Sequence, residues 1–191
     1  LIGVGLIGGS FVLDLKRLGL VDTVTGIDLD RDNLDRALER RVIDRAYTQI
    51  DALSMHEADL AVIATPVSTF PDICRTVRPY LNAHTVVTDV GSTKQSAVQA
   101  FRSVLPKHLS RCIAAHPIAG SDRSGALSAQ FGLFQDRKLV ITPHGDEDEQ
   151  AVSLVENLWL AVGAKTFRMS AEEHDAVFAA VSHMPPLAAF A

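Results

Sequence analysis

A glycine-rich segment near the start of the chain has the spacing of a phosphate-binding turn. Gly3, Gly5 and Gly8 form the pattern GxGxxG and lead directly into a segment with helical periodicity. The first glycine permits a tight turn, the second lets the backbone approach a pyrophosphate, and the third allows close packing between helix and strand. The start of the helix then presents N–H groups to the phosphates. We therefore expect a dinucleotide to be bound by Gly3, Gly5, Leu6, Ile7 and Gly8.

Asp28 lies where an acid that binds the ribose is expected. It closes a predicted strand over residues 23–28, 25 positions after Gly3. A carboxylate there can accept hydrogen bonds from the adenosine ribose hydroxyls, and it would repel a 2′-phosphate. The position therefore favours NAD over NADP, although Arg31 lies close enough in sequence to reduce the preference. The alternative role of Asp28 is that of an ordinary turn residue at the end of a strand.

Two further segments follow predicted strands, at the edge of an open α/β sheet where ligands bind. Thr65, Pro66 and Val67 either contact the cofactor or form an ordinary turn. Ser92 follows the next strand and precedes a predicted helix. It either caps that helix or hydrogen-bonds a substrate hydroxyl or the nicotinamide, and the two roles are compatible.

His116 is the candidate general base. It follows a predicted strand over residues 111–115, and Pro117 is expected to end regular pairing there, so that the imidazole sits at the mouth of the strand. A neutral imidazole can accept a proton near neutral pH. Four other histidines occur in polar or loop contexts and are interpreted as surface residues: His56, His84, His108 and His144.

Apolar runs of strand length alternate with segments of helical period, which indicates an α/β fold with a Rossmann-type doubly wound, mostly parallel sheet. Strands are predicted over residues 23–28, 59–64, 85–89, 111–115, 138–142 and 165–168, with a weak one near 46–48. Helices are predicted over residues 8–18, 31–40, 69–80, 94–105 and 147–160. Residues 1–169 would form the dinucleotide-binding domain. Residues 170–191, with a helix opening near Ser182, would be the truncated start of an α-helical second domain.

Charge and cysteine content limit the classes of protein. A net charge of −5 and a pI near 5.8 provide no basic surface for a nucleic acid. Cys74 and Cys112 lie 38 positions apart, which argues against a disulfide framework or a zinc site and favours a reducing compartment. No apolar run reaches the roughly 18 residues that a membrane span needs. We therefore expect a cytoplasmic protein with no metal site and no membrane or nucleic-acid partner.

Five motifs occur in the order and spacing typical of prephenate and arogenate dehydrogenases. They are GVGLIGGS at 3–10, DVGSTK at 89–94, HPIAGS at 116–121, HD at 174–175 and VSHMP at 181–185. The chain therefore resembles this family over essentially its whole length. The resemblance implies an enzyme of tyrosine biosynthesis that uses NAD, or less readily NADP, to oxidise and decarboxylate prephenate, arogenate or both.

The resemblance also implies roles for individual residues. His116 would be catalytic, bonding the ring 4-hydroxyl of the substrate and taking its proton as hydride leaves. Ser92 would bond the same hydroxyl, or hold His116 and the nicotinamide in place. His183 would line the substrate pocket at the start of the second domain. Such a reaction needs a cofactor, one base and groups that bind carboxylates, but no metal.

Two departures from the family pattern affect the substrate. Many members carry a second histidine three positions after the one that matches His183, and this chain has Pro186 there. The choice between prephenate and arogenate therefore stays open. The family's substrate-binding arginine lies in a helical dimerisation domain beyond Ala191, so we expect a homodimer formed through that domain.

Two other classes of protein fit part of the pattern. A dehydrogenase of the 3-hydroxyacid type also has a Rossmann domain followed by helices, but it would supply a lysine base on the first helix of its second domain. Residues 171–191 contain no lysine. A non-catalytic module that senses NAD would need the glycine turn and Asp28, but would have no use for His116 beside Ser92.

Overall fold

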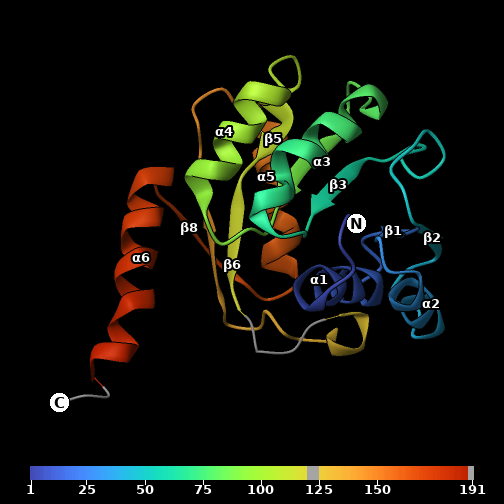
Figure 1. The fold of residues 1–191 in the computed structure, drawn as a ribbon, viewed down its shortest axis with the longest axis horizontal. Helices are drawn as coiled ribbons and strands as arrows, with labels where there is room; N and C mark the ends of the chain where they lie inside the picture. The colour runs from blue at the N-terminus through green and yellow to red at the C-terminus, as the bar shows by residue number, and fades with distance from the viewer. Residues whose placement is uncertain (120–124, 189–191) are drawn as a thin grey trace.

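The chain forms an α/β domain in which helices surround a central set of strands (Figure 1). The computed structural model describes residues 1–119 and 125–188, with side chains as far as Ala180. The strands are β1 (Thr25–Ile27), β2 (Arg45–Tyr47), β3 (Leu60–Ile63), β4 (Val86–Asp89), β5 (Cys112–Ile113), β6 (Ala115–Ile118), β7 (Lys138–Ile141) and β8 (Lys165–Arg168). The helices are α1 (Leu6–Arg17), α2 (Arg31–Glu39), α3 (Phe70–Val77), α4 (Lys94–Val104), α5 (Glu149–Ala161) and α6 (Ala171–Ala188).

Ile2 joins two groups of parallel strands. It forms parallel bridges to Ile27 of β1 and to Ile63 of β3. β1 pairs with β2, β3 with β4, and β4 with β5, all in parallel. After β5 the pattern becomes mixed, because β6 is antiparallel to β7 and β7 is parallel to β8. The prediction of a doubly wound, mostly parallel sheet is confirmed.

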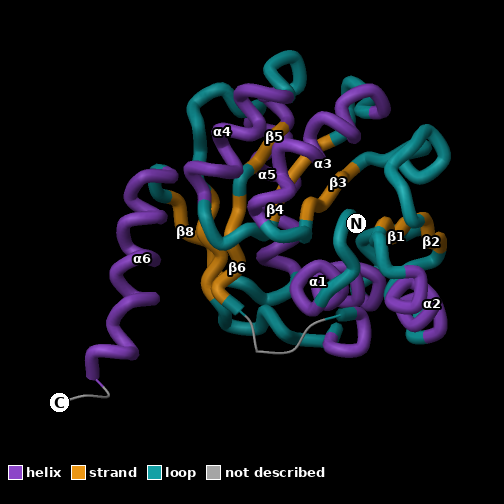
Figure 2. The backbone as a smooth tube through the Cα atoms, in the orientation of Figure 1, coloured by secondary structure: helices purple, strands orange, loops and turns teal. Residues whose placement is uncertain are grey.

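Neighbouring residues of the central strands point to opposite faces, and helices cover both faces (Figure 2). In β4, Val86 packs in one cluster with Phe11 of α1 and Trp159 of α5. Val87 belongs to a second cluster, which includes Phe101 of α4. Burial on both faces explains why these strands are apolar throughout instead of alternating with polar residues.

The starts of three helices are fixed by short-range side-chain hydrogen bonds. Asp30 accepts from the N–H of Asn33 in α2 (3.1 Å), and Asp148 accepts from the first turn of α5. Before α6, the Ser170 hydroxyl accepts from the N–H of Glu173, whose carboxylate accepts from the N–H of Ser170. This reciprocal capping box sets the start of α6.

Two predicted boundaries were wrong. The last helix begins at Ala171, well before Ser182, because the capping box starts it there. His116 and Pro117 lie inside β6 and not after the strand, with His116 opposite Val140 of β7. Pro117 does not end the pairing, because β6 is the edge strand of its group and an edge tolerates the missing N–H.

α6 lies to one side of the domain and packs against α4 (Figure 1). The assignment of residues 170–191 to a second domain stays a prediction. Among the helices in the described part of the chain, none is long and apolar enough to cross a membrane.

Candidate nucleotide and proton-transfer site

The glycine turn has the geometry that a phosphate-binding backbone needs. Gly3 has φ +88°, and a Cβ at this position would lie 2.7 Å from the carbonyl oxygen of Ala64. Its N–H donates to Ile27 O at 2.8 Å, which holds the turn against β1. α1 then begins at Leu6 with Gly5 at its N-cap, and no side chain caps it. The N–H groups of its first turn are therefore available to a ligand phosphate.

Asp28 is held directly beside this turn. Its Oδ2 accepts from the backbone N–H of Val4 at 2.9 Å, and its Oδ1 accepts from the N–H of Asp30 at 3.0 Å. The buried Asn33 donates to the carbonyl oxygen of Val4 at 2.8 Å and to Asp28 at 3.3 Å. Arg31 donates instead to Asp35, one helical turn further along α2 (3.0 Å). The acid is therefore fixed at the place where a ribose would lie.

The loop after β3 connects the glycine turn with the loop after β4. A Cβ added at Gly3 would lie 3.0 Å from the Thr65 side chain, and one added at Gly91 would lie 2.8 Å from Val67. The loop after β3 therefore lies against both the glycine turn and the loop after β4. Pro66, between Thr65 and Val67, has an extended conformation (ψ 139°) and leads into a 3-10 turn.

A buried ion pair joins the end of β4 to the strand that carries His116. The side chains of Lys94 and Asp89 are both fully buried and form a short hydrogen bond. Lys94 Nζ also donates to the carbonyl oxygen of Ala115 (2.6 Å), and Asp89 Oδ1 accepts from the Ala115 N–H (3.1 Å). Burial raises the pKa of the Asp89 carboxyl and lowers the pKa of the Lys94 ammonium, and the attraction between them opposes both shifts. The pair fixes the backbone immediately before His116.

His116 is packed against two rings of α6. Its Nδ1 lies 2.8 Å from Nε2 of His174, and the Phe178 ring centre lies 5.2 Å from its own. The pKa of His116 is lowered to about 3, mainly because the ring is buried and also through Lys94 and His174, while Asp175 acts in the opposite direction. The imidazole is therefore neutral across the physiological range and can accept a proton.

Ser92 does not cap α4. The cap residue is Thr93, whose side chain makes no cap hydrogen bond. Instead the Asp175 carboxylate of α6 accepts from the N–H groups of Lys94 (2.7 Å) and Gln95 (3.0 Å). Ser92 is exposed. On one side of it in the sequence, Gly91 lies against the β3 loop, and on the other side Lys94 bonds to the strand that carries His116.

Sequence reasoning missed several residues of this site. The Lys94–Asp89 pair and Asn33 carried no signal beyond the motif spacing, and His174 and Asp175 were noted only as a shared dipeptide. The interpretation of His144 as a surface residue was wrong, because its side chain is buried and its Nε2 lies 3.0 Å from Cys112 O. His56 and His84 are exposed, as predicted, whereas His108 is half-buried and bonds Thr85 O. His183 lies outside the residues whose side chains are described.

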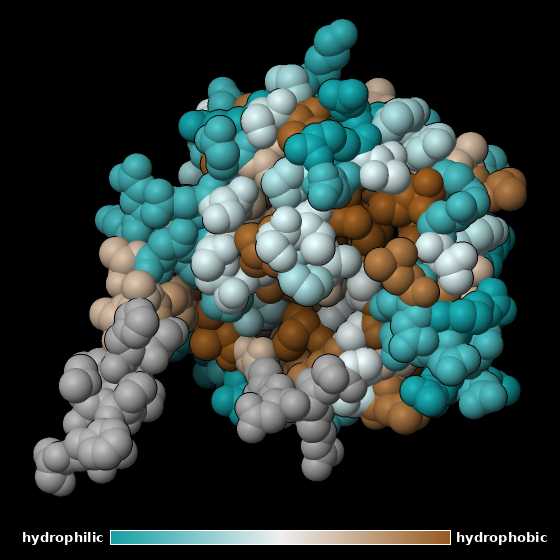
Figure 3. Space-filling view, in the orientation of Figure 1, coloured by the Kyte–Doolittle hydropathy of each residue, from teal (hydrophilic) through white to brown (hydrophobic). Residues whose placement is uncertain are grey.

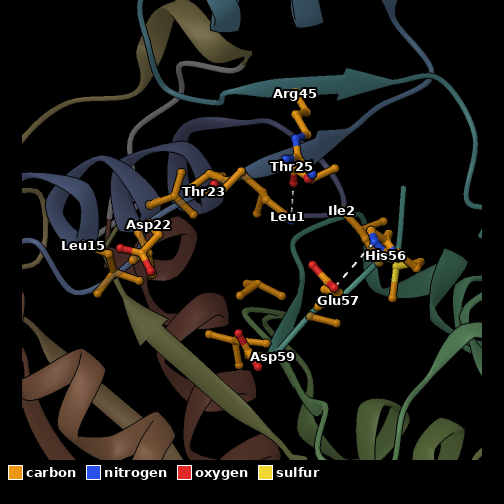
Figure 4. A pocket seen from close by; sticks show the side chains of 18 of the residues that line it. Leu1, Ile2, Leu15, Asp22, Thr23, Thr25, Arg45, His56, Glu57 and Asp59 are labelled. Atoms are coloured by element: carbon orange, nitrogen blue, oxygen red, sulfur yellow. Dashed lines mark hydrogen bonds and ion pairs between the residues drawn. The ribbon is translucent and has the colours of Figure 1, made fainter. Parts of the chain in front are cut away.

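A groove of about 740 Å³ lies at the opposite end of the sheet. It is lined by the starts of β1 and β3, including Thr25, Asp59 and Leu60, and the amino group of Leu1 donates to Thr25 O there (Figure 4). Figure 3 shows hydrophobic side chains around a hollow near the place where Figure 1 puts the N-terminus. Gly3, Asp28, Ser92 and His116 do not line this groove, so it is not part of the candidate site.

Within residues 1–119 and 125–188, no group of three or more His, Cys, Asp or Glu side chains is arranged to hold a metal ion. Both cysteines, Cys74 and Cys112, are buried free thiols. Burial raises the pKa of the Cys74 thiol to about 12 and that of Cys112 still further, which makes both unreactive.

These features define the class of the protein: a Rossmann-type domain with a glycine-rich turn suited to a nucleotide and a pair of hydrogen-bonded imidazoles. The sequence profile described as the nucleotide-binding domain of prephenate dehydrogenase matches residues 11–168. The chain therefore belongs to the prephenate dehydrogenase family, and the resemblance found in the five motifs is confirmed.

Individual relatives agree with this assignment. The chain is 37% identical to the prephenate dehydrogenase of Bacillus subtilis, covering 99% of the chain and 51% of that protein. It is 31% identical to the cyclohexadienyl dehydrogenase of Zymomonas mobilis, covering 100% of the chain and 64% of the relative. A crystal structure of prephenate dehydrogenase from Aquifex aeolicus with hydroxyphenyl propionate and NAD⁺ matches with 33% identity and a TM-score of 0.91, over 99% of this chain and 65% of that one. The chain thus spans about half to two thirds of the length of these proteins.

Proposed function

We propose that this chain is the cofactor-binding and proton-accepting part of an enzyme that oxidises and decarboxylates prephenate, arogenate or both, with NAD as the hydride acceptor. The observation that carries the proposal is the arrangement at the sheet edge. A neutral, half-buried imidazole, His116, lies on the strand that follows the nucleotide-binding unit, and the Ser92 loop connects the two. Family membership supports the same reaction.

NAD fits the residues that are present. The uncapped first turn of α1 and the tight approach at Gly3 suit a pyrophosphate. Asp28, oriented by Val4 and Asn33, suits the ribose hydroxyls, and Arg31 is paired with Asp35 instead of with Asp28. These contacts favour NAD over NADP, since a 2′-phosphate would lie against a carboxylate.

The residues of this chain supply the proton chemistry. Nε2 of His116 accepts the proton of the substrate's ring hydroxyl, which leaves the electron pair on oxygen free to form the ring carbonyl. When bound, NAD supplies the acceptor for the hydride that leaves the same ring carbon. The carbon–carboxylate bond then breaks, carbon dioxide leaves, and its electron pair makes the ring aromatic as a phenolate. The proton held on Nε2 can return to that phenolate oxygen, so His116 ends neutral. We expect Ser92 to bond the same oxygen.

The substrate's carboxylates need a cation, and the residues of α6 do not supply one. Residues 171–191 contain no arginine or lysine, and the first turns of α6 carry Glu172, Glu173 and Asp175. We propose that an arginine from outside residues 1–191 binds a substrate carboxylate and that the protein is a homodimer joined through helices of that region. Val177 of α6 is 49% exposed and would be covered there. The buried free thiols fit the cytoplasmic location expected from the sequence.

The proposal is tested by incubating the purified complete protein with NAD and prephenate or arogenate and recording the absorbance of the reduced cofactor. Turnover of at least one substrate is expected, with carbon dioxide released in equal amount. The 191-residue chain alone is expected to bind NAD but to turn over slowly or not at all. Binding of NAD by the complete protein without turnover of either substrate would contradict the proposed reaction.

A further inference from the structure

His116 is the first member of a hydrogen-bonded chain that ends at a helix N-terminus. Its Nδ1 lies 2.8 Å from Nε2 of His174, and Nδ1 of His174 lies 2.8 Å from Oδ1 of Asp175. Asp175 in turn accepts from the backbone N–H groups of Lys94 and Gln95, at the start of α4. The His174 side chain is fully buried, so water does not compete for its two ring nitrogens.

The donor and the acceptor of each hydrogen bond between His116 and the start of α4 can be assigned by starting from Asp175. Backbone N–H groups can only donate, so Asp175 must accept from them as a carboxylate. Burial would raise the pKa of Asp175, but the bonds from Lys94, His174 and Gln95 hold it below its usual value, and the carboxyl is ionised. His174 must then donate to it from Nδ1. In a neutral ring this leaves Nε2 of His174 as an acceptor.

The same reasoning fixes the tautomer of His116. Because Nε2 of His174 accepts, Nδ1 of His116 must carry the hydrogen and donate it. The lone pair of His116 is then on Nε2, the ring nitrogen that is not bonded to His174. Without a partner at Nδ1, a histidine in water would exchange between the two tautomers, and only one of them presents a base at Nε2.

We propose that His174 and Asp175 are positioning residues which hold His116 in the tautomer with a bare Nε2, so that the base is set before substrate binds. The inference rests on the proposed function, in which Nε2 is the atom that takes the proton. Its physical logic is that of a general base oriented by a second residue and a carboxylate. The helix N-terminus at α4 adds a fixed partial positive charge that keeps Asp175 ionised.

The arrangement also explains why α6 is part of the proton-accepting site. The capping box at Ser170 and Glu173 starts the helix one turn before His174, and α6 then packs on α4. Phe178, one turn after His174, lies over both rings, with centres 4.5 Å and 5.2 Å away. It packs against both imidazoles but takes no part in the hydrogen bonds from His116 to Asp175. A substitution at Phe178 is therefore a matched control for packing.

Three variants separate orientation from packing. His174→Phe removes the acceptor and keeps the volume, and we expect kcat to fall about 10- to 100-fold with little change in the Kd for NAD. His174→Gln offers a carbonyl oxygen to the Nδ1–H of His116, and should recover much of that loss. Phe178→Leu loosens the packing but leaves all three hydrogen bonds, and should change kcat less than threefold.

The decisive readout is ¹⁵N NMR of the His116 imidazole, which identifies the protonated nitrogen and needs no substrate. We expect hydrogen on Nδ1 in the unmodified protein, in His174→Gln and in Phe178→Leu, and a mixture of tautomers in His174→Phe. Hydrogen on Nε2 in the unmodified protein, or an unchanged tautomer and unchanged kcat in His174→Phe, would overturn the proposal. If neither prephenate nor arogenate is turned over but the tautomer still depends on His174, the proposed reaction fails and the positioning role stands.

Discussion

The two halves of the site are held in place by different forces. At the nucleotide turn, backbone N–H groups, glycines and one carboxylate do the positioning, and the partners are close in sequence or on the adjoining strand. The His116 side chain and the backbone before it are positioned by three fully buried side chains from three different elements, those of Lys94, Asp89 and His174. A side chain at the nucleotide turn can therefore be removed at little cost to folding. Removal of one charge of the Lys94–Asp89 pair would instead leave the other charge buried and unpaired.

The largest effect is expected at the base itself. His116→Asn keeps a polar side chain but cannot take a proton at neutral pH, so kcat should fall about 10²–10⁴-fold. Because the residue lies outside the nucleotide turn, the Kd for NAD should stay nearly unchanged. His56→Asn is the matched control, since that side chain is 64% exposed and lines the groove that is not part of the site. A near-normal kcat in His116→Asn would show that His116 is not the base.

The buried ion pair predicts the largest loss of stability. Lys94→Met leaves the Asp89 carboxylate and the Ala115 carbonyl oxygen without a buried partner, and should lower the free energy of unfolding by about 3–5 kcal/mol. Urea unfolding measures this directly. Lys165→Met breaks an exposed ion pair with Asp136 and should leave the urea midpoint almost unchanged. Equal effects of the two substitutions would mean that burial does not decide the contribution of these pairs.

The low pKa of His116 predicts how stability depends on pH. In the folded protein the imidazole stays neutral down to a pKa of about 3, while in the unfolded chain it takes a proton near pH 6.5. The unfolded state therefore binds more protons between these values, and His116 makes the fold lose stability as pH falls below 6.5, by at most about 1.4 kcal/mol per pH unit.

Urea titrations at pH 7, 6 and 5 should show a shallower loss in His116→Asn than in the unmodified protein. The other ionisable groups that face the imidazole, Lys94, His174 and Asp175, are present in both proteins and cancel in the comparison. Identical slopes would show that the folded state protonates His116 as readily as the unfolded chain does.

A smaller and more specific effect is expected at the nucleotide turn. Asp28→Asn keeps an oxygen for the Val4 N–H but removes the charge that repels a 2′-phosphate, so the preference for NAD over NADP should narrow by roughly tenfold. Ratios of kcat/KM for the two cofactors give the answer, with Asp32→Asn on α2 as a control for net charge. If the unmodified enzyme already uses both cofactors equally, Asp28 does not select the cofactor.

The difference between the two halves also decides how much the sequence could predict. The glycine turn and Asp28 act through local backbone geometry, and the spacing of a few residues predicts their positions. His116 was found from its place near a strand end, but the strand continues through it as β6. The sequence did not show that His174 is its partner, because His174 lies 58 positions away and reaches His116 only through the packing of α6 on α4.

Ser92 and His144 also show that a local sequence pattern does not predict contacts with residues distant in sequence. A serine before a helix is usually its cap, but here Asp175, 81 positions from Lys94, has taken that role. His144 lies in an acidic, polar stretch that is typical of a surface, yet its ring is buried against the Cys112 carbonyl. In both cases a partner distant in sequence overrides the local pattern, and no local pattern contains that information.

The central claim is that this domain joins a hydride acceptor to a base that removes the proton of the same ring alcohol. Substrate carrying deuterium on the ring carbon that bears the hydroxyl tests it most directly, in the complete protein with NAD. The account predicts one deuterium in each reduced cofactor, one carbon dioxide per turnover, and label transfer slowed about 10²–10⁴-fold in His116→Asn, which still binds NAD. Reduced cofactor without deuterium, or label transfer by His116→Asn at the rate of the unmodified protein, would contradict it.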